Sequence, residues 1–146
     1  YKNAFFDILT NTFINNVANS KGGAFHISGT QTAARVKDSS FIENKAGSGG
    51  AISIESSASM QMFNTNGVGN IAEKGDGGFL FARVAVPILL SNVTIDAGSA
   101  KENGGGIASY SSRVALDQVT IQRCSAENGD GGGLLLDEGS LSYVRM

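Results

Sequence analysis

The chain has 146 residues and a formal net charge of −2, with 11 basic and 13 acidic side chains and no run of like charge. This balance gives no electrostatic footprint for nucleic acid or for an anionic membrane surface. A single cysteine, Cys124, excludes an intrachain disulfide. No apolar run approaches the roughly 18 residues that a membrane span needs. Glycine is abundant, with 20 residues, whereas proline occurs once, which argues against a disordered Pro/Gly linker.

A pair of glycines recurs along the whole chain, with its first member at Gly22, Gly49, Gly77, Gly104 and Gly131. Successive pairs are therefore 27 or 28 residues apart. Two residues beyond the second glycine stands a large apolar residue, and two residues further on stands another apolar or small one. This period-two alternation predicts a short strand with one face in a core. The expected inward column consists of Phe25, Ile52, Leu80, Ile107 and Leu134.

A second apolar column has nearly the same period. Its expected members are Phe13, Phe41, Val68, Ile95 and Ile121. Each of them follows a short segment that contains Asn, Asp, Ser, Thr or Gln, most of which are common turn residues. Two columns at one period predict that like residues stack on like residues in successive coils of a repeat fold.

The period also distinguishes among repeat folds. The LxxLxLxxN pattern of a leucine-rich repeat is absent, and a repeat of helix pairs would need helical periodicity and less glycine. Short β-rich segments separated by turn residues fit a coil of three strands and three turns. We therefore predict an all-β fold, a parallel β-helix of about five to six coils with a period near 27 residues, as one segment over residues 1–146. Both termini fall within a coil, so we expect a fragment of a longer repeat protein whose strand edges are covered by further coils or by another chain.

Two short motifs carry a resemblance to a known family. Residues 13–16 and 41–44 fit FxxN, and residues 22–25 and 49–52 fit GGA followed by an apolar residue. Their alternation resembles the repeats of polymorphic outer membrane proteins, most closely over residues 8–54. The resemblance implies a right-handed parallel β-helix that is displayed at the cell surface and serves in adhesion or surface structure. Beyond residue 54 the glycine pairs persist but FxxN does not, so an inward asparagine ladder is expected only in the first coils.

Many β-helix proteins cleave polysaccharides, which directs attention to the carboxylates beside the glycine pairs. Asp76 and Asp130 would stand two coils apart, at roughly 10 Å by strand spacing, near the upper limit for an inverting glycosidase pair. Asn103 stands between them, and Asp and Asn are common beside glycine in turns, which is the preferred interpretation. A structural calcium ion near residues 129–133 stays open, although the nonapeptide GGxGxDxUx is absent. No other cofactor is expected.

Three single residues carry separate expectations. His26, the only histidine, alternates out of phase with Phe25 and Ile27 and is expected to point away from the core. Cys124 occupies the asparagine position of FxxN and is expected to fill an interior column as a small residue. Asn92 begins the only Asn-x-Thr sequon, in a predicted turn, and is a candidate glycosylation site if the source is eukaryotic and secretory.

The third coil departs from the repeat because it is apolar on both faces. The expectation is that Leu80, Val86, Ile88 and Leu90 face the core and that the alternating apolar residues face outward. A strand that is apolar on both faces is usually buried on both, and exposed apolar patches mark interaction sites. We expect a neighbouring subunit or a flanking domain to pack on this face, with a local register shift or a flanking segment of the same chain as the alternatives. The expected partner surface consists of Phe79, Phe81, Pro87, Leu89 and Leu135.

Function is predicted only coarsely by these patterns. The leading hypothesis is a non-enzymatic extracellular or cell-surface rod, a structural or adhesive element or a filament building block, with protein or glycan partners and no nucleic acid. The alternative is a carbohydrate-active β-helix protein that cleaves or binds polysaccharides. Coils of nearly equal length favour the first hypothesis, because an enzyme would need long loops to wall a cleft.

Overall fold

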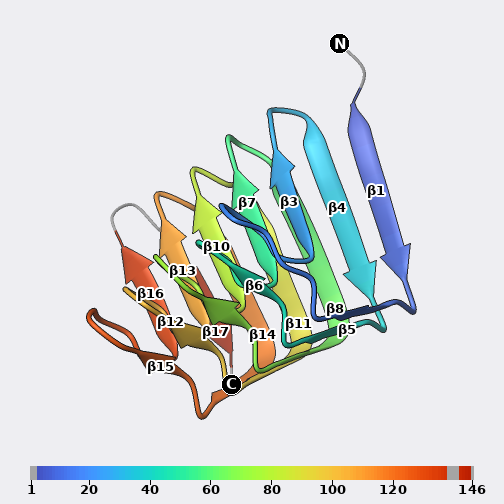
Figure 1. The fold of residues 1–146 in the computed structure, drawn as a ribbon. Coiled ribbons are helices and arrows are strands. Elements are labelled where there is room, and N and C mark those ends of the chain that lie inside the picture. Colours follow the sequence, from blue (N-terminus) through green and yellow to red (C-terminus); the bar gives the residue numbers. More distant parts are fainter. Residues whose placement is uncertain (1–2, 138–141, 146) are drawn as a thin grey trace.

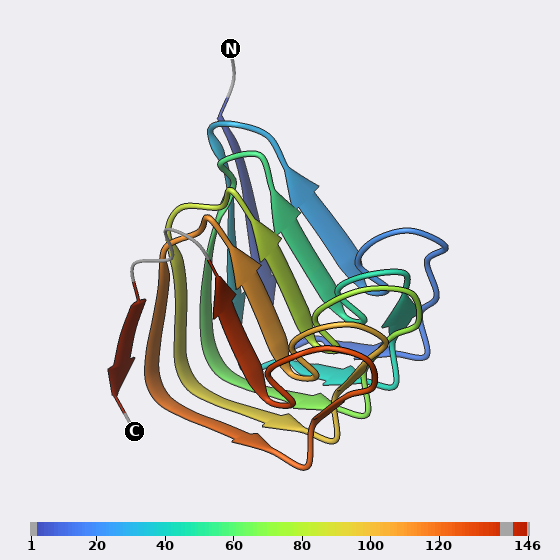
Figure 2. The same cartoon turned by 90° about the vertical axis from the view of Figure 1, so that its left-hand side faces the viewer.

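The structure, a computed structural model, describes residues 3–137 and 142–145. All strand pairs in these residues are parallel, and the chain winds into a parallel β-helix of about five coils (Figures 1 and 2). Paired residues of successive coils are 26 to 28 positions apart, as in Ala34 with Met60 and Met60 with Ile88. The predicted all-β fold and its period are thereby confirmed.

The strands form three sheets that run along the stack. The eight-stranded sheet contains β1 (Ala4–Leu9), β2 (Thr12–Ile14), β4 (Thr32–Lys37), β5 (Ser40–Ile42), β8 (Ser59–Val68), β11 (Ile88–Asp96), β14 (Val114–Gln122) and β17 (Ser142–Arg145). The five-stranded sheet contains β3 (Phe25–Ser28), β7 (Ile52–Glu55), β10 (Leu80–Arg83), β13 (Ile107–Tyr110) and β16 (Leu134–Asp137). The four-stranded sheet contains β6 (Lys45–Ala46), β9 (Ile71–Ala72), β12 (Ser99–Ala100) and β15 (Ser125–Ala126).

The first predicted column is confirmed as the centre of the core. Strand pairing places its members opposite one another in β3, β7, β10, β13 and β16. Ile52, Leu80 and Ile107 have no exposed surface, and each such side chain contributes about 1.5–3 kcal/mol to folding by leaving water. No coil could bury this face alone, because it is the coils above and below that cover it.

The second predicted column is wrong at one position. Strand pairing places Gly67, and not Val68, between Phe41 and Ile95. Val68 lies on the outer face of β8, where its side chain is 41% exposed. A glycine carries no apolar signal, so the sequence pattern selects its apolar neighbour and shifts the register by one residue.

Phe79 supplies the volume that Gly67 lacks. A Cβ atom on Gly67 would lie 2.4 Å from the Phe79 ring, so the ring occupies the space of the missing side chain. Phe79 has no exposed surface and packs edge-to-face on Phe41, with ring centroids 5.8 Å apart. The expectation that Phe79 faces outward is therefore wrong, and the reason is this exchange of a large and a small residue within the third coil.

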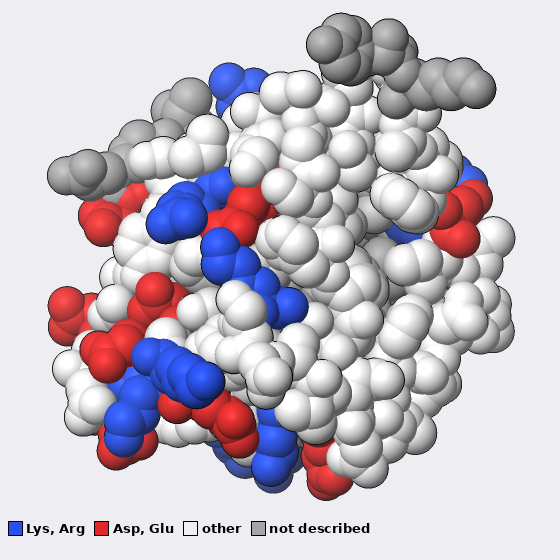
Figure 3. Space-filling view, turned by 45° about the horizontal axis from the view of Figure 1, so that its top comes forward, with Lys and Arg blue, Asp and Glu red and all other residues white. Residues whose placement is uncertain are grey.

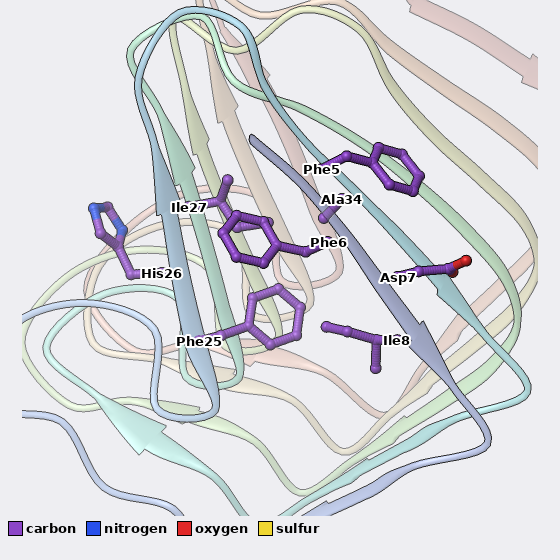
Figure 4. Close-up of a pocket in the computed structure, with 8 residues that line it drawn as sticks. All are labelled: Phe5, Phe6, Asp7, Ile8, Phe25, His26, Ile27 and Ala34. Atoms are coloured by element: carbon purple, nitrogen blue, oxygen red, sulfur yellow. The ribbon is translucent and has the colours of Figure 1, made fainter. Parts of the chain in front are cut away.

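The first coil leaves part of this apolar interior open. Phe6 and Ile8 of β1 and Phe25 and Ile27 of β3 point toward one another across a hollow of about 360 Å³ (Figure 4). Phe6 is 52% exposed, whereas the paired Ala34 of the next coil is buried. The hollow is lined by the same columns that form the core further along the stack, so we interpret it as core and not as a ligand site.

Candidate functional site

Charged side chains from three coils meet on the outer face of the five-stranded sheet. Pairing of β3, β7 and β10 places His26, Ser53 and Phe81 in one outward column and Ser28, Glu55 and Arg83 in the next. Lys21 reaches the same place from the turn before the first glycine pair. The Glu55 cluster is defined here as Lys21, His26, Ser53, Glu55 and Arg83.

Glu55 is the centre of this cluster and is only 7% exposed. Lys21 Nζ donates to both carboxylate oxygens, at 2.7 and 2.5 Å, and Arg83 Nη2 lies 3.2 Å from Oε1. His26 Nε2 lies 4.0 Å from Oε2. A buried carboxylate requires such partners, because it has lost the solvation that water would give it. Glu55, Lys21 and Arg83, one carboxylate and two cations, together carry a net charge of +1.

Arg83 faces solvent, in contrast to Glu55. Its side chain is 58% exposed, and it borders a hollow of about 270 Å³ that is also lined by Glu55, Ser56 and Val84. A guanidinium has five N–H donors, and one contact to Glu55 leaves most of them free for another acceptor. In Figure 3, basic and acidic side chains lie side by side over one part of the surface, and the adjoining surface carries few charges.

The glycine turns explain why the base of the cluster is buried. A Cβ on Gly49 would lie 3.1 Å from Phe81 Cβ, and one on Gly104 would lie 2.8 Å from Ala108 Cβ. Both glycines have φ near +60°, a conformation that L-residues with side chains rarely adopt. The turns therefore lie directly on the outer face of the sheet. Under this cover the Ser53 hydroxyl is buried and has no hydrogen-bond partner among the described residues.

The expected partner surface is not one surface. Phe81 does point outward, but it is 6% exposed, because the turns of its own chain and the Tyr110 ring, with its centroid 6.0 Å away, cover it. Leu135 lies in the same column, two coils further on. Leu89 belongs to the eight-stranded sheet and Pro87 to the irregular segment before β11. Phe79 lies in the core, and for Phe81 the turns of the same chain provide the cover that the sequence pattern assigns to a partner.

Asp76 and Asp130 belong to a hydrogen-bonded ladder of turns. Asp76 Oδ1 accepts from Asn103 N at 2.8 Å and from Asn103 Nδ2 at 3.0 Å. Asn103 Oδ1 accepts in turn from Asp130 N at 2.8 Å. Burial raises the pKa of Tyr110 to about 12, and the negative charge of Asp76 contributes to the rise. The Tyr110 hydroxyl lies 3.2 Å from Asn103 Nδ2. These contacts agree with turn chemistry as the preferred interpretation of both residues, through the carboxylate of Asp76 and the backbone N–H of Asp130.

The asparagine ladder is longer than the sequence pattern indicates. Asn16, Asn44 and Asn70 are linked by side-chain hydrogen bonds of 2.8 and 3.0 Å, so the ladder extends into the third coil. In FxxN the asparagine stands three residues after the inward residue. With Val68 taken as the inward residue, the asparagine is expected at position 71, whereas the true inward residue Gly67 places it at Asn70. Cys124 takes the corresponding place in the fifth coil, as predicted, with Sγ 3.3 Å from Gln122 O and 3.9 Å from Ile95 O.

Asn92 lies at an exposed corner of β11. Its Nδ2 donates to Asn64 Oδ1 at 2.9 Å, and Asn64 Nδ2 donates to Asp38 Oδ1 at 3.0 Å. All three residues have φ near +50°, so they form an outer ladder along the corner. The amide nitrogen that glycosylation would modify is thus part of a hydrogen bond between coils.

Lys21, Glu55 and Arg83 were not identified from the sequence. The sequence contains one signal for them. Glu55 and Arg83 carry opposite charges, stand 28 positions apart, and occupy equivalent outward-facing positions of successive strands. Lys21 gives no such signal, because it bonds across to the next coil from a turn. His26 was expected on the surface and lies there, beside the carboxylate.

Three further findings complete the description of the chain. Within residues 3–137 and 142–145, no group of three or more His, Cys, Asp or Glu side chains converges as a metal site would. The same residues contain no helix long and apolar enough to cross a membrane. Comparison of the chain with protein-family models, with curated proteins and with solved structures gave no significant match.

Proposed function

We propose that the protein is a non-enzymatic β-helix rod that serves outside the cell or on its surface as a structural or adhesive element. The observation that carries this proposal is the uniformity of the stack. Each coil adds equivalent strands and turns, and paired residues stay 26 to 28 positions apart throughout. A catalytic β-helix would need coils with long loops that surround reacting groups, and the described coils have none.

Contacts between coils support a mechanical role. The asparagine ladder and the corner ladder run along the axis of the stack, and three exposed ion pairs also join successive coils: Asp7 with Arg35, Asp96 with Arg123, and Lys101 with Glu127. Hydrogen bonds from the arginines lower the pKa of Asp7 and of Asp96. A single exposed pair contributes little stability. Many such contacts, all of them between successive coils, nevertheless resist a pulling force along the axis of the stack. An extended rod experiences a force in this direction.

Placement at the surface is supported by the two motifs. FxxN at residues 13–16 and 41–44 and GGA at residues 22–24 and 49–51 resemble the repeats of polymorphic outer membrane proteins. In the fold these motifs supply the inner aromatic column, the asparagine ladder and the turns that cover the sheet. Short motifs specify a fold more strongly than a function, so the adhesive role requires a direct test.

The alternative, a polysaccharide-cleaving enzyme, has less support. Asp76 Oδ1 already accepts two hydrogen bonds in the turn ladder, and Asp130 lies in the same ladder, which it joins through its backbone N–H. The full chain should therefore release no new reducing ends from neutral or acidic polysaccharides. Beads coated with the chain should be retained on a glycan-coated surface better than beads coated with albumin. Cleavage that Asp76→Asn or Asp130→Asn abolishes would establish the enzyme instead.

A further inference from the structure

We infer that the Glu55 cluster binds one anionic group, a carboxylate or a sulfate, of an acidic glycan. This inference rests on the proposed adhesive function and names its ligand class. Arg83 is the residue that would contact the anion, and Glu55 and Lys21 hold the site in place. The hollow beside Arg83, lined by Glu55, Ser56 and Val84, is where the anion would lie.

The burial of Glu55 is the first argument for a built site. Buried ion pairs are often no more stabilising than apolar residues of the same volume, so stability alone does not explain why Glu55 is buried together with two cationic partners. What the triad does achieve is to orient two cations. Lys21 Nζ contacts both oxygens of Glu55, and Arg83 contacts one of them from the solvent side.

The free donors of Arg83 are the second argument. One contact of 3.2 Å to Glu55 leaves the rest of an exposed guanidinium available, and its planar fork matches the two oxygens of a carboxylate or sulfate. The cluster is also locally positive although the whole chain has a net charge of −2, so its own field attracts an anion.

The surroundings restrict the site itself to one anionic group of the ligand. Tyr110 is paired with Arg83 in the neighbouring strand and provides a partly exposed aromatic ring. The next acidic side chains, Asp76 and Asp137, act on Tyr110 and would repel a second negative charge further along the stack. A sugar chain that carries a carboxylate or a sulfate has this combination of an anionic group and neutral hydroxyl-bearing surface.

The test measures binding of the full chain to immobilised polygalacturonate, dextran sulfate and neutral dextran by surface plasmon resonance. We expect binding to at least one acidic polymer, no binding to dextran, and weakening by added salt. Arg83→Gln should reduce the affinity by roughly tenfold or more, because a charge-assisted hydrogen bond is lost. Arg83→Lys should bind with an intermediate affinity, since it keeps the charge but loses the planar fork.

Arg113→Gln is the matched control, because it removes the same charge from an exposed residue outside the cluster. It should bind like the unaltered chain, and thermal unfolding should show that every variant is folded. Equal binding by Arg83→Gln and the unaltered chain, equal binding to dextran, or no binding to either acidic polymer would overturn the inference. The tighter of the two acidic polymers identifies the anion. Failure of the proposed function would appear separately, as shortening of the polygalacturonate chains.

Discussion

Val84, next to Arg83, has a backbone conformation that is unfavourable for its side chain. It is β-branched and has φ of 50°, in the left-handed region where such residues are rare. The equivalent residues of the neighbouring coils, Ser56 and Ser111, have φ of 56° and 47°. The corner of the coil therefore imposes this conformation, and the strain in the third coil arises from the valine that occupies it.

Val84→Asn should stabilise the protein by about 1 kcal/mol, because asparagine tolerates the left-handed conformation. Val84 is 50% exposed, so little packing would be lost. Urea unfolding of the two chains measures the difference. Val86→Asn, at an exposed position without positive φ, is the control and should give no gain. A loss of stability in Val84→Asn would show that the valine side chain contributes packing that outweighs the strain.

The position of Cys124 in an interior column was predicted correctly from the repeat spacing. The spacing places equivalent residues of each coil in the same column, whatever their side chains. Burial raises the pKa of its thiol above the usual value, and the thiolate is the reactive form. Below that raised pKa the native thiol is protonated, so a disulfide reagent should modify it several-fold more slowly than it modifies the urea-unfolded chain. Equal rates at pH 8 would contradict this assignment. The Glu55 cluster had no comparable signal, because its ion pairs depend on which outward positions the turns cover.

At the scale of the element, the third coil shows what a repeat pattern predicts and what it misses. Period-two alternation locates nearly every inner residue, because burial of one face requires it. It fails at Gly67 and Phe79, where the coil obtains its core volume from a different position. It also fails at Val86, which was expected in the core and is 38% exposed. It also gives no indication that glycine turns cover the outer face, since that depends on how the turn packs in space and not on the phase of the strand.

The Gly67 and Phe79 exchange can be reversed by mutation. Phe79→Ala alone should cost about 3–5 kcal/mol through the cavity that it leaves. Gly67→Phe alone should also destabilise, because its Cβ would already lie 2.4 Å from the Phe79 ring. The double variant recreates the arrangement of the second coil, where Phe41 stands with Ala51, and should recover most of the loss. Calorimetric unfolding of all four chains gives the coupling free energy, and strictly additive losses would contradict the exchange.

At the scale of the whole molecule, we expect local stability to differ from one coil of the stack to the next. Each strand of a sheet pairs only with the strands of the coils before and after it, so interactions are between nearest neighbours. The sequence predicted this linear architecture from two columns of one period. What it could not predict was the local strength of each coil, because that depends on exchanges such as Gly67 with Phe79 and on ladders such as that of the asparagines.

Ile52→Ala tests this nearest-neighbour description. Ile52 is fully buried in β7, and its truncation should cost about 2–5 kcal/mol. Because β7 pairs only with β3 and β10, hydrogen exchange measured by mass spectrometry should speed up most in these three strands and least in β16, three coils away. Ile107→Ala, a fully buried residue of the same column in β13, should move the effect to β10, β13 and β16. An equal acceleration in every strand for both variants would instead mean that the coils open as one cooperative unit, because the free energy lost at one coil would then be felt at all of them.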